Sequence, residues 1–138
     1  MKDNTDNNIS PCPCDSGKPF KDCCQPYLER RQDTPTAESL MRSRYTAFVM
    51  QDEEYLRYSW HPDHRPKVIH LNPETKWLGL KIMNTLAGKP DDETGEVEFV
   101  ARSKNKGKAN RLHENSQFKR FDGRWVYADG NIRNKKSR

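Results

Sequence analysis

Residues Thr36–Met50, TAESLMRSRYTAFVM, predict an amphipathic α-helix on which the rest of the fold can be arranged. Apolar side chains recur in it at steps of three and four residues, at Ala37, Leu40, Met41, Tyr45, Phe48 and Val49. This spacing places them on one side of a helix, so we expect that side to be buried. Thr34-Pro35 predicts the start of the helix, with Thr34 as the N-cap and Pro35 in the first helical position.

Shorter helices are expected on both sides of this one. Residues 25–33 favour the first, and Glu53–Tyr58 favours the second. The second helix ends before Trp60-His61-Pro62, because a proline disfavours helical geometry at the residue that precedes it. Residues 63–73 predict a loop.

Alternating apolar residues after this loop predict antiparallel β-strands. The three alternating sets are Leu78, Leu80 and Ile82; Val97, Phe99 and Ala101; and Leu112 and Phe118. Asp122-Gly123 predicts a two-residue hairpin turn, because both residues tolerate positive φ. The turn would pair Phe121 with Arg124, Arg120 with Trp125, and Phe118 with Tyr127. We therefore expect an α+β fold with one main core.

The composition sets limits on the class of protein. The 138 residues suffice for one ordinary domain. Hydrophobic residues make up 32% and charged residues 33%, against about 45–50% and about 25% in typical globular chains, so this fold needs a further stabilising element. No apolar stretch approaches the roughly 18 residues of a membrane span, and Met1–Asn8 lacks the apolar centre of a signal peptide. We expect a cytoplasmic protein with no membrane partner.

Four cysteines form two pairs near the start of the sequence, Cys12 with Cys14 and Cys23 with Cys24. Four thiolates suit a tetrahedral zinc ion, and a filled four-cysteine site has no open position for catalysis. Two alternatives stay open. Disulfides are disfavoured by the adjacency of Cys23 and Cys24 and by a reducing compartment, and the Cys12-Pro-Cys14 spacing differs from that of the usual redox-active pair. We favour structural zinc, whose binding energy would stabilise a segment that lacks any helix or strand period.

The stretch Cys12–Cys24, CPCDSGKPFKDCC, resembles the SEC-C zinc motif at its cysteines, at Gly17 and at Phe20-Lys21. This resemblance implies a zinc ion held by four ligands and, often, an adaptor role toward a protein partner. Further stretches resemble the YchJ family: LMRSRYTAF at Leu40–Phe48, WHP at Trp60–Pro62, HENSQF at His113–Phe118 and GRWVY at Gly123–Tyr127.

The YchJ resemblance implies a nuclear-transport-factor-2-like cone, in which a curved antiparallel sheet wraps around helices. Together the two resemblances divide the sequence into four parts. These are a disordered N-terminus (1–8), the SEC-C zinc-binding motif (9–33), the cone domain (34–132) and a basic disordered tail (133–138).

Polar side chains are predicted on two otherwise apolar faces. Arg44 lies on the buried side of the long helix, and Glu114 shares a strand face with Phe118. The hairpin register adds residues of the following strand to that face, and the concave surface that results would form a pocket. The candidate pocket residues are Arg44, Tyr45, His61, Glu114, Ser116, Trp125 and Tyr127.

These pocket residues admit two interpretations. In the functional one, Arg44 binds an anionic small molecule while Glu114 or His61 moves a proton. In the structural one, which we favour, Arg44 and Glu114 form an internal ion pair that fixes the helix on the sheet. No residue of the sequence resembles a nucleophile with an attendant base.

Three functions are compatible with these features. The favoured one is a noncatalytic zinc-containing module that docks a protein or a ribosome. The second is binding or conversion of a small molecule in the cone around Arg44 and Glu114. The third is nucleic-acid binding, because the net charge is +5 and basic residues gather in two clusters. The clusters are Lys104, Lys106, Lys108 and Arg111, and Arg133, Lys135, Lys136 and Arg138.

Overall fold

The computed structural model describes residues 10–132, so the predicted disordered segments 1–8 and 133–138 lie outside the described residues. Helical elements come first in this range: a 3-10 helix η1 (Phe20–Asp22), then α2 (Gln25–Leu28), α3 (Ala37–Met50) and α4 (Glu53–Tyr58). The strands follow as β1 (Thr75–Ala87), β2 (Thr94–Asn105), β3 (Lys108–Phe121) and β4 (Arg124–Ile132). The predicted α+β class is confirmed.

The strands form one antiparallel sheet in the order β1-β2-β3-β4. The β3–β4 hairpin has the predicted register, with Phe121 opposite Arg124, Arg120 opposite Trp125 and Phe118 opposite Tyr127. Asp122 and Gly123 have φ values of 53° and 80°, as this kind of tight hairpin turn requires. The pairing of β1 with β2 shifts register twice, and such irregularities bend a strand and increase its twist.

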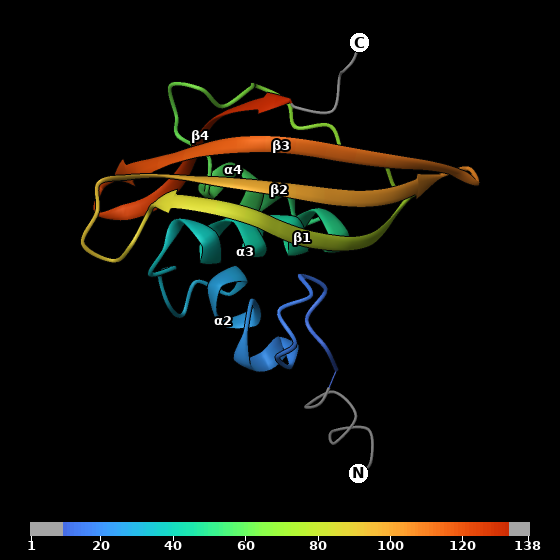
Figure 1. Ribbon diagram of the computed structural model, residues 1–138, viewed down its shortest axis with the longest axis horizontal. Helices are drawn as coiled ribbons and strands as arrows, with labels where there is room; N and C mark the ends of the chain where they lie inside the picture. Colours follow the sequence, from blue (N-terminus) through green and yellow to red (C-terminus); the bar gives the residue numbers. More distant parts are fainter. Residues whose placement is uncertain (1–9, 133–138) are drawn as a thin grey trace.

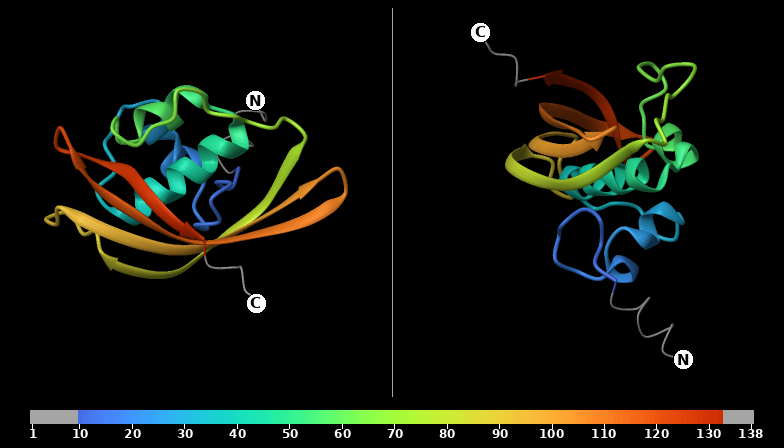
Figure 2. Two further views of the ribbon diagram at one scale, coloured as in Figure 1. Left: turned by 90° about the horizontal axis from the view of Figure 1, so that it is seen from above. Right: turned by 90° about the vertical axis from the view of Figure 1, so that its right-hand side faces the viewer.

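The sheet curves around α3 and α4, which lie on its concave side (Figure 2). The buried side of α3 contributes Leu40, Met41 and Tyr45 to the core, and the sheet contributes Phe99 and Phe118. This arrangement is the cone that the YchJ resemblance implies. It places side chains of α3 opposite the concave face of β2 and β3.

The start of α3 differs from the prediction by two residues. Thr36, not Thr34, is the N-cap. Its side-chain oxygen accepts a hydrogen bond from the Ser39 backbone nitrogen at 3.0 Å, and the Ser39 hydroxyl accepts one from the Thr36 backbone nitrogen. This reciprocal capping box satisfies two otherwise unpaired donors. Pro35 therefore lies before the helix, and the helix predicted over 25–33 is limited to the four residues of α2.

The cysteine segment packs under α3 and the β1 edge of the sheet (Figure 1). Asp15 accepts a hydrogen bond at 3.0 Å from the Leu80 backbone nitrogen on β1. Gly79 makes room for this contact, because a Cβ there would lie 2.9 Å from the Asp15 carboxylate. On the helix side, Arg42 donates to the Cys14 carbonyl oxygen at 2.8 Å. The segment is thus fastened to the domain at two points.

Candidate metal centre and adjoining cavity

The four cysteine sulfurs lie together, all within 4.8 Å of one another. The Cys14 and Cys23 sulfurs are 3.6 Å apart, and those of Cys23 and Cys24 are 3.9 Å apart. Sulfurs bound at about 2.3 Å to a tetrahedral zinc ion lie about 3.8 Å from one another. All four are free thiols, at separations well beyond the roughly 2.05 Å of a disulfide. The donor set and its spacing fit a metal ion.

Local backbone turns bring the two cysteine pairs together. Pro11 and Pro19 form an isolated antiparallel bridge, and the Cys12 backbone nitrogen donates to the Lys18 carbonyl oxygen at 3.0 Å. The loop between them turns at Asp15 and Gly17, which have φ values of 63° and 91°. These positive values suit glycine and are tolerated by aspartate.

The cluster belongs to the protein core. Cys12, Cys14 and Cys24 are buried, at 3%, 0% and 1% exposure, whereas Cys23 is half-buried. The Thr46 hydroxyl of α3 lies 3.4 Å from the Cys24 sulfur, and the Ser16 hydroxyl lies 3.1 Å from the Cys23 sulfur. Such neighbours orient metal ligands and tune their basicity.

Crowding makes the thiols unequal. Hydrogen bonds from Cys12 and Cys24 hold the pKa of Cys14 far below its usual range, while burial raises the pKa of Cys23 to about 11. Contacts with Cys12 and Cys14, together with burial, raise the pKa of Cys24 as well. Because a metal binds thiolates, its binding must release protons from this cluster.

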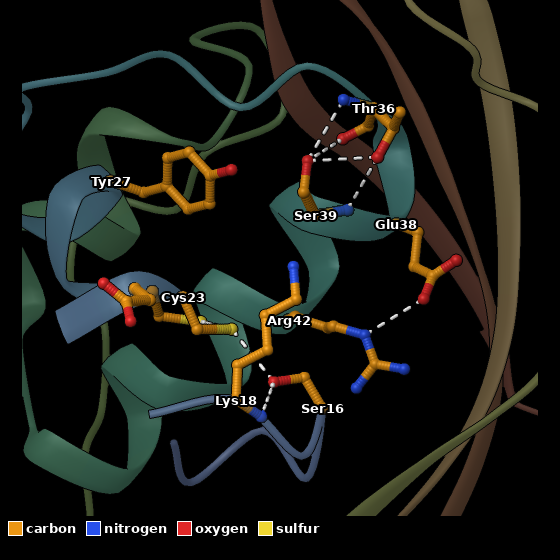
Figure 3. A pocket seen from close by; sticks show the side chains of 10 residues that line it. Ser16, Lys18, Cys23, Tyr27, Thr36, Glu38, Ser39 and Arg42 are labelled. Atoms are coloured by element: carbon orange, nitrogen blue, oxygen red, sulfur yellow. Dashed lines mark hydrogen bonds and ion pairs between the residues drawn. The ribbon is translucent and has the colours of Figure 1, made fainter. Parts of the chain in front are cut away.

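A polar groove opens beside the half-buried Cys23 (Figure 3). Its volume is about 380 Å³, and its walls come from the cysteine segment and the first turns of α3. Arg42 in this wall pairs with Glu38 at 3.0 Å. The named lining residues are Ser16, Lys18, Asp22, Cys23, Cys24, Tyr27, Thr36, Glu38, Ser39 and Arg42.

A separate cavity of about 240 Å³ lies between α3 and the concave face of the sheet. Five of the predicted pocket residues line it: Arg44, Tyr45, Glu114, Ser116 and Tyr127. Its other walls are mostly apolar, with aromatic rings from Trp60, Trp77 and Phe99. Polar groups therefore converge in a small and largely aromatic space.

Arg44 and Glu114 do not form the predicted ion pair. Arg44 donates from Nη1 to the Leu56 carbonyl oxygen at 3.0 Å and to the Ser59 hydroxyl at 2.8 Å. Glu114 instead accepts hydrogen bonds on Oε2 from Ser116 at 2.7 Å and from Tyr127 at 3.2 Å. The prediction was wrong because Tyr127 contacts both residues: its ring lies 4.7 Å from the Arg44 guanidinium, and its hydroxyl donates to Glu114.

Comparison with known proteins identifies both parts of the chain. Residues 36–130 match the family model described as the YchJ middle NTF2-like domain, and residues 10–26 match the SEC-C motif. The chain belongs to the YchJ family. A UPF0225 protein from Chromobacterium violaceum is 47% identical over 123 residues, covering 86% of this chain and 90% of that protein. A UPF0225 protein from Bordetella pertussis is 46% identical over 132 residues, covering 92% and 98%.

Two solved structures resemble this YchJ-family protein. The solution structure of a SEC-C motif containing protein from Rhodopseudomonas palustris has a TM-score of 0.78 and 34% identity, covering 87% of this chain and 96% of that one. The crystal structure of a SEC-C motif containing protein from Psychrobacter arcticus has a TM-score of 0.71 and 27% identity, covering 95% and 87%. The cone with an attached cysteine segment is thus shared with solved relatives.

Two residues predicted for the pocket of this YchJ-family chain lie elsewhere. His61 is buried, but its ring packs on Phe121 at 5.2 Å and its Nδ1 accepts a hydrogen bond from the Asp63 backbone nitrogen. Trp125 lies deeper, where its Nε1 donates to the Pro35 carbonyl oxygen at 3.2 Å. His61 was misplaced because its loop has no periodicity that fixes a direction, and Trp125 because the core fills the space around it.

Sequence reasoning missed Trp60 and Trp77 as cavity residues of this YchJ-family fold. Trp77 precedes a register shift on β1, which period-two alternation does not anticipate. Trp60 lies beside the cavity because its backbone forms an isolated β-bridge with Tyr127, which also lines the cavity. The one sequence feature that pointed to them was the presence of aromatic residues close to the predicted pocket residues in the chain.

The basic residues Lys104, Lys106, Lys108 and Arg111 lie at and beside the β2–β3 turn. Lys106 pairs with Glu74 at 3.5 Å, so part of this charge is offset. The tail cluster at 133–138 lies outside the described residues. Among residues 10–132, no helix has the length and apolar character needed to cross a membrane.

Proposed function

We propose that this YchJ-family protein binds zinc as a structural ion and uses the clamped cysteine segment as a noncatalytic docking module for a protein or ribosomal partner. The observation that carries the proposal is the four-sulfur cluster, with its members within 4.8 Å of one another. Thiolate ligands in tetrahedral arrangement favour zinc.

A structural role follows from the ligand count. Four sulfurs complete the coordination of a tetrahedral ion, so no position remains for a substrate. Three of these cysteines are buried against the domain. Asp15 ties the segment to β1, and Arg42 of α3 donates to the Cys14 carbonyl oxygen. The ion would therefore hold this segment against α3.

Docking is supported by the groove beside Cys23. Ser16, Lys18 and Cys23 of the clamped segment line this groove, and Lys18 is exposed. The SEC-C resemblance adds an adaptor role as an expectation. A partner would meet a rigid polar surface whose shape depends on the ion.

Metal analysis tests the zinc half. Protein purified without added metal should contain about one equivalent of zinc, measured by mass spectrometry of the intact protein and by elemental analysis. Cys12→Ser should lose it. Well under one equivalent in the unaltered protein would remove the premise.

Co-sedimentation with purified ribosomes tests the docking half. Lys18→Glu should abolish sedimentation while keeping its zinc, whereas Lys108→Glu, an equal charge change at the β2–β3 turn, should leave sedimentation intact. The reverse pattern would favour the nucleic-acid alternative. If the unaltered protein does not sediment with ribosomes, that form of the docking proposal fails.

A further inference from the structure

The cone cavity contains a buried cation that is only partly satisfied. Arg44 is 4% exposed, and burial lowers its pKa to about 10, so it remains a cation near neutral pH. Both of its hydrogen bonds leave from Nη1. Within residues 10–132, Nε and Nη2 have no hydrogen-bond acceptor. The face of the guanidinium packs on the rings of Trp60 and Tyr127, 4.8 and 4.7 Å from their centroids.

The free nitrogens are not sealed inside the core. In the described part of the chain, the one sealed side-chain nitrogen or oxygen without a partner is Nε of Arg124. Arg44 itself lines the cavity. Nε and Nη2 lie on one edge of a guanidinium, and this edge matches the two oxygens of a carboxylate.

Glu114 provides a second polar contact in the same cavity. Its Oε2 already accepts hydrogen bonds from Ser116 and Tyr127, while Oε1 has no donor among the described residues. Gly130 leaves space for this carboxylate, since a Cβ at that position would overlap it. A ligand group that donates a hydrogen bond is the natural partner for Oε1.

The size and walls of the cavity limit the rest of the ligand. An apolar cavity of about 150 Å³ holds one benzene ring, and this cavity has about 240 Å³. Rings of Trp60, Trp77 and Phe99 form much of its wall. The space suits one substituted ring, stacked or edge-on against aromatic side chains.

We propose that the cavity binds a small ring-containing carboxylic acid that also bears a hydroxyl donor. The carboxylate would bind Nε and Nη2 of Arg44, the ring would lie among the aromatic walls, and the hydroxyl would donate to Glu114. This inference is independent of the docking function, because the groove at Cys23 and the cone cavity share no lining residue.

Titration with four simple probes tests the ligand class. The probes are 4-hydroxybenzoate, benzoate, 4-hydroxyacetophenone and toluene, added to the full metal-containing chain. Binding is followed by calorimetry and by tryptophan fluorescence, to which Trp60 and Trp77 of the cavity wall contribute. 4-Hydroxybenzoate should bind with a Kd on the order of 1 mM or tighter, and at least about tenfold tighter than 4-hydroxyacetophenone, which lacks the carboxylate.

Two variants locate the site. Ala101 lines the cavity, so Ala101→Leu should fill it and weaken 4-hydroxybenzoate at least about tenfold. Arg102→Leu adds the same side chain at an exposed neighbour and should leave binding unchanged. Ala101→Leu removes none of the hydrogen bonds of Arg44, which go to Leu56 and Ser59. An unaltered circular dichroism spectrum would show that the variant is folded.

Glu114→Gln distinguishes the two ends of the ligand. Removing the negative charge should make benzoate bind more tightly. It should also reduce the difference in affinity between 4-hydroxybenzoate and benzoate. The proposal is overturned if no probe binds the unaltered protein at about 10 mM, if Ala101→Leu binds 4-hydroxybenzoate as well as the unaltered protein, or if the uncharged probes bind as tightly as the acids.

Discussion

The two sides of α3 differ in how completely their polar groups are paired. On one side, Arg42 bonds to the Cys14 backbone and Thr46 lies against the Cys24 sulfur, so the helix closes over the cysteine cluster. On the other side, Arg44 and Tyr45 face a cavity, and Arg44 keeps free donors. One helix thus separates a region suited to holding structure from a region suited to binding.

Metal removal should produce the largest difference between the two regions. Structural zinc in finger peptides contributes on the order of 10 kcal/mol, so stripping the ion should lower Tm by roughly 10 °C or more. The loss should be concentrated in residues 10–28, measured by hydrogen exchange. Equal loss of protection in β3 would contradict the separation.

Alkaline pH should give the next largest effect, through Tyr45, which lines the cavity and whose phenol also interacts with Asp15 of the cysteine segment. Burial raises the pKa of Tyr45 from 10.0 to about 12. The folded form therefore favours the neutral phenol, and this stability is complete below pH 10.0 and lost as pH rises toward about 12, by at most about 2–3 kcal/mol. Urea unfolding at several pH values measures it.

Tyr45→Phe is the control for that titration. It has no phenol to ionise, so its stability should fall less steeply above pH 10.0 than that of the unaltered protein. Parallel curves would show that Tyr45 does not contribute. Tyr55 and Tyr127, whose pKa values burial also raises, account for the decline that remains.

Gly130→Ala should disturb the Glu114 end of the cavity. The added Cβ would meet the Glu114 carboxylate and would lie 2.8 Å from the Tyr127 hydroxyl oxygen. Overpacking of this kind costs about 1–3 kcal/mol, measured by urea unfolding. Adding Glu114→Ala should recover part of the loss, and strictly additive effects would argue against the contact.

Thr46→Val should give the smallest effect, confined to the cysteine side. It keeps the shape of the side chain and removes the hydroxyl that lies 3.4 Å from the Cys24 sulfur. Changes next to metal ligands typically weaken metal affinity at least about tenfold, which a competition titration with a chelator measures. Binding of 4-hydroxybenzoate should not change.

Sequence reasoning succeeded where a period or a fixed turn determined the answer. The stripe on α3 placed Arg44 inside, and the Asp122-Gly123 turn fixed the register of β3 and β4. Sequence reasoning failed where the answer depended on the distance between two side chains. Periodicity places Arg44 and Glu114 on facing surfaces, but whether they touch depends on the ring of Tyr127 and on the acceptors Leu56 and Ser59.

The helix start and the pocket rim show the same limit. Two threonines precede α3, and only the backbone conformation shows that Thr36 and Ser39 form the cap. The turn after α4 directs His61 toward Phe121, which no residue pattern encodes. The cysteine cluster could be predicted from the sequence, because the spacing of its four cysteines is that of a known zinc motif.

The bond from the Leu80 nitrogen to Asp15 has a consequence for behaviour in concentrated solution. β1 is a sheet edge, and Leu78, Met83 and Leu86 on it are 55%, 47% and 62% exposed. Exposed edges with apolar side chains recruit strands from other molecules. By occupying one donor of that edge, the cysteine segment also obstructs intermolecular pairing, so loss of the metal should appear as self-association as well as local unfolding.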